Sequence, residues 1–150
     1  MYNNTNNSYM SSYVEIFKKS LDDFNINYVD GDEKDSVLLN LRLNNMGDLR
    51  ALAFFKPLNI DTSNSCCMFD LYFQVTPLEN PPLSAFELCN AINKEYKIFN
   101  VYLDDDSMWC QATIFVNLSN CANLCNFTLL KTVMTIDEYY PQIMKIRWGI

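Results

Sequence analysis

The sequence contains no histidine and only three glycines among its 150 residues. Histidine is the commonest general base and a common metal ligand, so its absence excludes Ser-His-Asp and Cys-His catalytic arrangements. The three glycines, Gly31, Gly47 and Gly149, are too widely separated to form a glycine-rich phosphate-binding loop. The sequence therefore predicts no catalytic residues, no cofactor and no enzymatic activity.

Basic residues are also scarce. The chain has 11 Lys and Arg against 18 Asp and Glu, which gives a formal net charge of -7 at pH 7. A chain of this charge repels phosphate backbones, and the sequence shows no basic patch that would offset the repulsion. We therefore expect no nucleic-acid partner.

Long hydrophobic runs are missing as well. No stretch approaches the roughly 18 consecutive apolar residues that a membrane-spanning helix needs. Residues 1–12 carry no basic residue and no apolar run, unlike a secretory signal. These features predict a cytoplasmic protein with no membrane partner.

Apolar residues, in contrast, are plentiful: they make up 49% of the sequence, and aromatic residues alone make up 14%. A chain of this length and composition can bury a core of its own. We expect a single domain over residues 9–150, preceded by a flexible polar tail at residues 1–8.

The spacing of apolar residues predicts three helices and about five strands. The first helix is expected to begin at a capping box formed by Ser12 and Glu15 and to end near Asn25. Residues 26–29 could then form a short extended piece. Alternation with a period of two predicts the strands, and helical spacing predicts two further helices. The strands are expected at about 36–44, 49–55, 67–75, 97–103 and 108–118, and the helices at about 82–96 and from about 120 onward.

The predicted order is α-β-β-β-α-β-β-α, which indicates an α+β domain with an antiparallel sheet. Because proline lacks a backbone donor, Pro141 is expected to break or kink the last helix. Asp137 and Glu138, just before it, are expected on a solvated helix face. Asp104–Asp106 are expected in a solvated hairpin turn.

The six cysteines are expected to be core residues with reduced thiols. Cys121 and Cys125 lie one helical turn apart and could share a metal ion. A structural zinc site usually needs four ligands with spacings such as CxxC, and the chain has neither that spacing nor a histidine. The sequence therefore predicts no metal site.

Three segments carry a resemblance to a known family. They are Cys89–Tyr96 with the following Phe99–Asp106, then Asp137–Lys145, and finally Trp148-Gly149. Together they resemble the bacterial YbjN-like family, also described as sensory transduction regulators, whose domains are similar to type III secretion chaperones. The resemblance implies a small acidic cytosolic domain that forms a homodimer and holds or regulates another protein. It implies no catalytic residues.

One further pattern concerns the second face of the predicted sheet, which carries apolar side chains where a one-sided sheet would be polar. Such a face needs a cover, which could be the second helix, the loop at residues 58–65, a second subunit or a bound peptide. Aromatic side chains dominate interface hot spots, so Phe54, Tyr72 and Trp109 are the candidate anchors. The full apolar set at these positions is Leu52, Phe54, Met68, Tyr72, Trp109 and Phe115.

Two hypotheses about function follow. The first is a homodimeric protein-binding or regulatory module that uses the second sheet face or the second helix. The alternative is a small-ligand or metal-responsive regulator that uses Cys121, Cys125 and the acidic hairpin.

Overall fold

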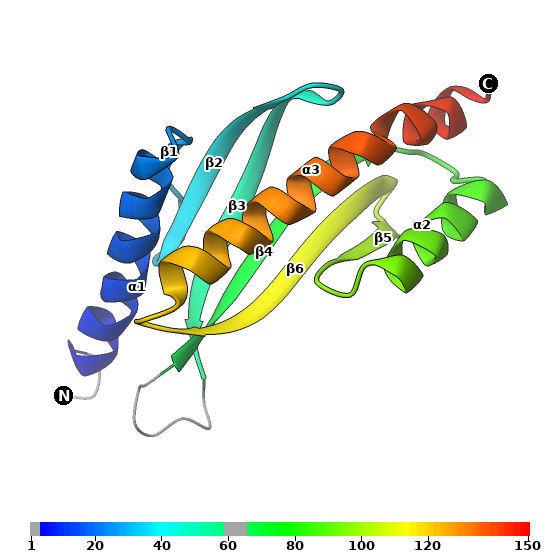
Figure 1. Cartoon of the computed structure of the whole chain (residues 1–150). Coiled ribbons are helices and arrows are strands. Elements are labelled where there is room, and N and C mark those ends of the chain that lie inside the picture. Colours follow the sequence, from blue (N-terminus) through cyan, green and yellow to red (C-terminus); the bar gives the residue numbers. More distant parts are fainter. Residues whose placement is uncertain (1–3, 59–65) are drawn as a thin grey trace.

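The computed structural model describes residues 4–58 and 66–150, which form three helices and one antiparallel sheet of six strands in the order β1-β2-β3-β4-β6-β5 (Figure 1). The predicted α+β class is confirmed, with β1 as a strand beyond the five expected. The elements are α1 (Asn4–Asp23), β1 (Asn27–Asp30), β2 (Ser36–Leu43), β3 (Gly47–Pro57), β4 (Cys66–Pro77), α2 (Leu83–Glu95), β5 (Asn100–Asp104), β6 (Ser107–Asn117) and α3 (Cys121–Trp148).

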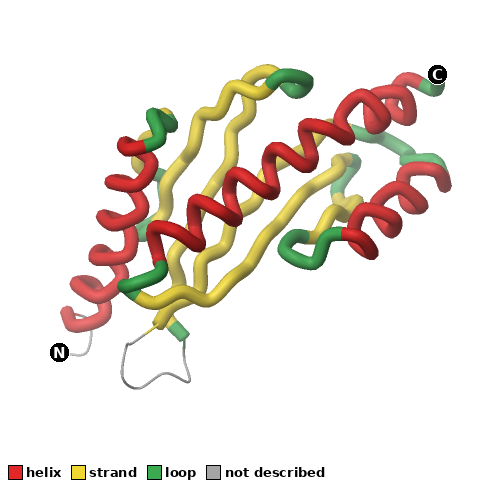
Figure 2. Tube along the Cα trace, viewed as in Figure 1, coloured by secondary structure: helices red, strands yellow, loops and turns green. Residues whose placement is uncertain are grey.

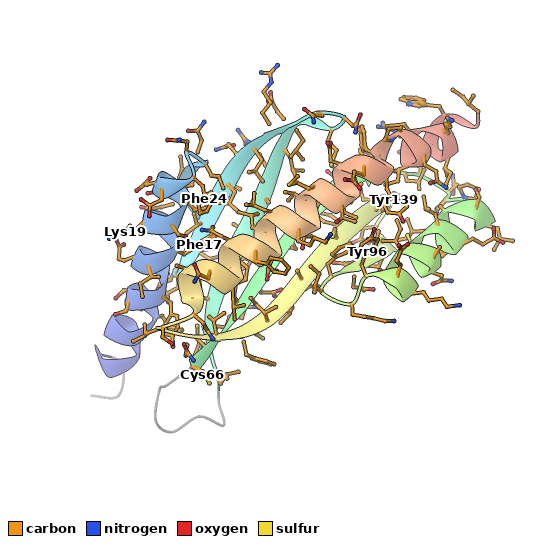
Figure 3. The ribbon with its side chains drawn as sticks, in the orientation of Figure 1. Phe17, Lys19, Phe24, Cys66, Tyr96 and Tyr139 are labelled. Carbon is orange, nitrogen blue, oxygen red and sulfur yellow. The ribbon has the colours of Figure 1, made fainter. Side chains whose placement is uncertain are left out.

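All three helices lie on the same side of the sheet (Figures 1 and 2). Helix α3 crosses the sheet, with α1 beside β1 and α2 beside β5. Phe17 extends from α1 toward the sheet and packs edge-on against Phe69, with ring centroids 5.3 Å apart (Figure 3). On the other flank, Tyr96 meets Tyr139 of α3 at 6.3 Å. The buried apolar side chains form one continuous core between the helices and this face of the sheet.

The first helix begins earlier than the sequence predicted. Helix α1 already includes residues 4–8, which had been assigned to a flexible tail, so Ser12 lies inside the helix and cannot cap it. The physical reason is Met10, which is buried with Tyr13 and extends the apolar stripe of the helix by one turn. Residues 1–3 of the predicted tail lie outside the described residues.

The last helix continues through Pro141, so the break that was one of the two expected outcomes does not occur. Proline at this position leaves the carbonyl oxygen of Asp137, four residues earlier, without its helical donor. The side-chain amide of Asn45, in the turn between β2 and β3, donates to that oxygen at 2.9 Å. A tertiary hydrogen bond thus replaces the missing helical one. Beyond the proline, buried Ile143 keeps the helix packed on the core.

Asp137 is buried, so the expectation of a solvated face is wrong for this residue. Its carboxylate accepts hydrogen bonds from the backbone N–H of Asn45 at 3.0 Å and of Met46 at 2.7 Å. Both donors belong to the β2–β3 turn, which Asp137 therefore ties to α3. Glu138, in contrast, is exposed as expected.

The other junctions agree with the sequence. The expected hairpin between β5 and β6 turns at Asp105 and Asp106, whose φ angles are 47° and 56°. The Asn93 side chain accepts a hydrogen bond from the N–H of Val101 and donates one to its C=O, both at 2.7 Å. This amide ties α2 to β5.

No helix in the described part of the chain is long and apolar enough to cross a membrane.

The bond between Asn45 and the Asp137 carbonyl can be tested with a double-mutant cycle. Asn45→Ala should lower the free energy of unfolding by about 1 kcal/mol, because it leaves a carbonyl without a donor. In a Pro141→Ala background the new N–H of residue 141 can serve the same carbonyl, so the cost should largely vanish. Urea unfolding monitored by circular dichroism measures all four proteins.

Asn44→Ala, at an exposed neighbouring position of the same turn, is the matched control and should cost little in either background. Equal costs of Asn45→Ala in the two backgrounds would show that the amide does not compensate for the proline.

Candidate interaction surface on the open sheet face

The second face of the sheet is not covered by any helix in residues 4–58 and 66–150 (Figure 1). We call it the open face. Of the four possible covers, the second helix is excluded, because α2 buries Ala85, Leu88 and Ile92 in the core on the opposite side. Residues 59–65 of the loop that was the other intramolecular candidate lie outside the described residues.

The three predicted anchors come together on this face. Phe54 of β3 stacks on Tyr72 of β4 with ring centroids 5.6 Å apart and an interplanar angle of 16°. Tyr72 in turn meets Trp109 of β6 at 6.3 Å. Side chains on adjacent strands lie close enough for such contacts when they share a face. The three rings therefore form one continuous row across three strands.

A fourth aromatic residue, Tyr102 of β5, extends the row, and sequence reasoning missed it. Tyr102 is paired directly with Trp109 in the β5–β6 register, so both side chains occupy the open face. Partial burial and the nearby charge of Asp104 raise the pKa of the Tyr102 hydroxyl. The alternation within β5 could have predicted this placement, because Val101 is buried and Tyr102 must therefore point to the opposite face. We call Phe54, Tyr72, Trp109 and Tyr102 the aromatic row.

The members of this surface differ in how accessible they are. Phe54 is only 8% exposed and forms the floor of the row, whereas Tyr72 and Trp109 are half-buried. The indole N–H of Trp109 donates to the carbonyl of Asp104 at 3.2 Å, which orients the ring. Phe115, farther along β6, is 63% exposed. Tyr72, Trp109 and Phe115 therefore contribute accessible apolar area to this face.

A polar cluster that the sequence analysis missed lies beside the row. The Asp70 carboxylate is buried and accepts hydrogen bonds from the Gln111 side-chain amide at 2.9 Å and the Thr113 hydroxyl at 2.9 Å. The Lys56 ammonium lies 3.7 Å from the same carboxylate. Because every partner comes from a neighbouring strand, the cluster locks β3, β4 and β6 together. The sequence did carry a signal for this cluster, because the acidic Asp70 lies between Phe69 and Leu71 within a predicted strand.

Five of the six cysteines are core residues, as predicted, whereas Cys66 is partly exposed. Cys67, Cys89, Cys110, Cys121 and Cys125 are buried and form no disulfide. The sulfur atoms of Cys121 and Cys125 are 3.9 Å apart. Within the described ranges, no group of three or more Cys, Asp or Glu side chains is arranged to hold a metal ion. Burial raises the pKa of Cys67 to about 12 and that of Cys89 to about 11, so these thiols are held in the neutral form.

Comparison with solved structures finds the same fold in YbjN from E. coli, which has been put forward as a transcription regulator. The two chains are 14% identical, with a TM-score of 0.50, and the alignment covers 86% of this chain and 92% of YbjN. The likeness confirms the fold that the family resemblance implied.

A second solved structure that aligns is the Yersinia pestis type III secretion chaperone SycH in complex with a fragment of YscM2. It has a TM-score of 0.45 and 9% identity, and the alignment covers 83% of this chain and 96% of SycH. No protein-family model and no curated protein sequence matches this chain.

Thiol labelling tests the burial of the cysteines. At pH 8 a thiol with a pKa of about 12 has roughly one part in 10,000 in the reactive thiolate form. In the native protein only Cys66, which is partly exposed, should react quickly with Ellman's reagent. The other five should react after denaturation, and Cys66→Ser should abolish the fast phase. A second fast equivalent in the native protein would contradict the burial.

Proposed function

We propose that this protein is a non-enzymatic, cytoplasmic protein-binding module that holds or regulates a partner through its open face. The observation that carries the proposal is the aromatic row, which no helix of the described residues covers. Antiparallel sheets commonly have one solvated face, and that face is then normally polar. Here it carries aromatic rings with the size and rigidity that dominate interface energetics.

The architecture supports binding in a second way. The polar cluster around Asp70 and the stacked rings hold the side chains of the open face in place before any partner arrives. A surface ordered in advance loses less conformational entropy on binding. Burial of a large apolar side chain contributes about 1.5 to 3 kcal/mol, so Tyr72, Trp109 and Phe115 could supply much of the affinity.

Free, buried thiols support the cytoplasmic part of the proposal. Reducing compartments keep cysteines unpaired, whereas small secreted domains usually pair them. Cys67, Cys89, Cys110, Cys121 and Cys125 form no disulfide, which is typical of the former.

We also propose that the protein is a homodimer, with α2 as the contact between the two copies. Leu83 and Phe86 are exposed on this helix, on the side facing away from the core. Using α2 for self-association would leave the open face of each copy available to a partner.

The alternative, a metal- or ligand-responsive regulator, finds weaker support. Its favourable observation is the close approach of the Cys121 and Cys125 thiols. Metal binding requires thiolates, however. The hydrogen bond with Cys125 lowers the pKa of Cys121, but burial raises the pKa of Cys125, so the pair does not supply two thiolates.

Site-specific photocrosslinking tests the binding surface. Phe115 on the open face and Phe127 on α3 are similarly exposed, at 63% and 58%, but lie on opposite faces. With benzoylphenylalanine at each position in turn, native cytosol should yield a protein adduct at 115 and little at 127. Combining Tyr72→Ala with Trp109→Ala should reduce that adduct about tenfold or more, because it removes two anchors.

Phe127→Ala serves as the control and should leave the adduct unchanged. An adduct at 127 alone, or one that does not respond to the double substitution, would refute the surface assignment.

Light scattering tests the dimer. The native protein should have twice the mass of one chain, and Leu83→Glu with Phe86→Glu should halve it, because buried unpaired charges are costly at an interface. Phe24→Glu, at an exposed position on another helix end, is the matched control. A native mass equal to one chain would exclude the dimer.

A further inference from the structure

Two of the three arginines in the chain, Arg42 and Arg50, line the same hollow on the sheet. The hollow has a volume of about 410 Å³. We call it the arginine hollow. Its lining residues are Asn27, Asn40, Leu41, Arg42, Asp48, Leu49 and Arg50.

Strand register explains why these side chains converge. Asn27 pairs with Asn40, and Asn40 pairs with Arg50, so the three residues form one row across β1, β2 and β3. Arg42 pairs with Asp48, one step along the same face. Their immediate neighbours Leu39, Ala51 and Leu49 are buried in the core, so the polar residues occupy the open face. The hollow therefore lies on the same face as the aromatic row.

The charges of this region are available to a ligand. Arg42 approaches Asp48 only to 4.0 Å, with both side chains almost fully exposed at 88% and 87%. Exposed pairs of this kind contribute little, so Arg42 can change partners at small cost. Arg50 has no ion pair within residues 4–58 and 66–150. Lys56, which also lies on the open face, is already engaged by Asp70 and lies over the Phe54 ring.

Guanidinium and amide groups together favour a carboxylate ligand. Arginine binds carboxylates through a planar, bidentate arrangement of donors, and the amides of Asn27 and Asn40 supply further donors. The rest of the molecule, at a net charge of -7, repels large polyanions such as nucleic acids. A short acidic segment could approach the hollow without facing the whole of that charge.

We propose that the open face recognises a peptide segment that carries acidic residues next to aromatic or aliphatic ones. Its carboxylates bind in the arginine hollow, and its apolar side chains pack on the aromatic row. This inference rests on the proposed function and specifies the chemistry of the partner. Charge complementarity between the two arginines and the acidic segment sets the orientation of the bound peptide.

Selection from a random dodecapeptide display library on the immobilised full chain tests the proposal. The enriched peptides should combine Asp or Glu with Trp, Phe or Leu. The best peptide, made synthetically, should lose about tenfold in affinity by fluorescence anisotropy when its acidic residues are changed to Asn or Gln. Arg42→Gln and Arg50→Gln should each cause a similar loss.

Lys19→Gln is the matched control, since it removes the same charge from an exposed position on α1 and should leave affinity unchanged (Figure 3). Trp109→Ala should weaken binding of the same peptide about tenfold or more through loss of an anchor. Higher salt should weaken binding of the acidic peptide and have little effect on binding of the peptide whose acidic residues are changed to Asn or Gln.

The outcomes separate this inference from the function on which it rests. Two outcomes would overturn the inference and leave the binding surface intact. In the first, the enriched peptides are neutral or basic. In the second, they are acidic, and their affinity responds to Trp109→Ala but to neither arginine substitution. No enrichment, or no response to Trp109→Ala, would refute the proposed function as well. Arginine-dependent displacement of the peptide by an oligothymidylate would overturn the inference in favour of nucleic acid.

Discussion

The hydrogen bonds between Asp137 and the β2–β3 turn hold α3 across the sheet, and the division of the sheet into a covered and an open face depends on that position. Asp137 contributes both its side chain and its backbone. Its carboxylate accepts from the backbone N–H groups of Asn45 and Met46, and its backbone carbonyl accepts from the Asn45 side-chain amide. Pro141 is what leaves that carbonyl available. The proline that was expected to disturb α3 thus leaves a carbonyl through which the helix is attached to the β2–β3 turn.

The long antiparallel pairing of β4 with β6 is the second constraint. Its register places Leu71 opposite Ala112 on the covered face and Asp70 opposite Thr113 on the open face. A slip by one residue would exchange the two sets, bringing a carboxylate into the core and exposing the leucine. The hydrogen bonds from Gln111 and Thr113 to Asp70 reinforce the correct register, because they form only when these side chains share a face.

The open face therefore combines three structural properties. Its aromatic rings are stacked and ordered, its central carboxylate is internally neutralised, and its hollow presents two arginines whose charges are not strongly paired. The helices on the other side pack on the core. This arrangement places the proposed binding residues on one face of the sheet and the core on the other.

The amino-acid sequence by itself determined the α+β class, most of the element order and the residues of each strand that share a face, because alternation and helical spacing are local properties. It also identified Phe54, Tyr72 and Trp109 as candidate anchors. Tertiary structure alone decided that α2 leaves the open face uncovered, that Asp137 is buried and that α3 continues past Pro141. It also brought Arg42 and Arg50 to one hollow and added Tyr102 to the aromatic row. These outcomes depend on contacts between segments far apart in the chain, and no local pattern encodes which distant donor will reach a given carboxylate or carbonyl.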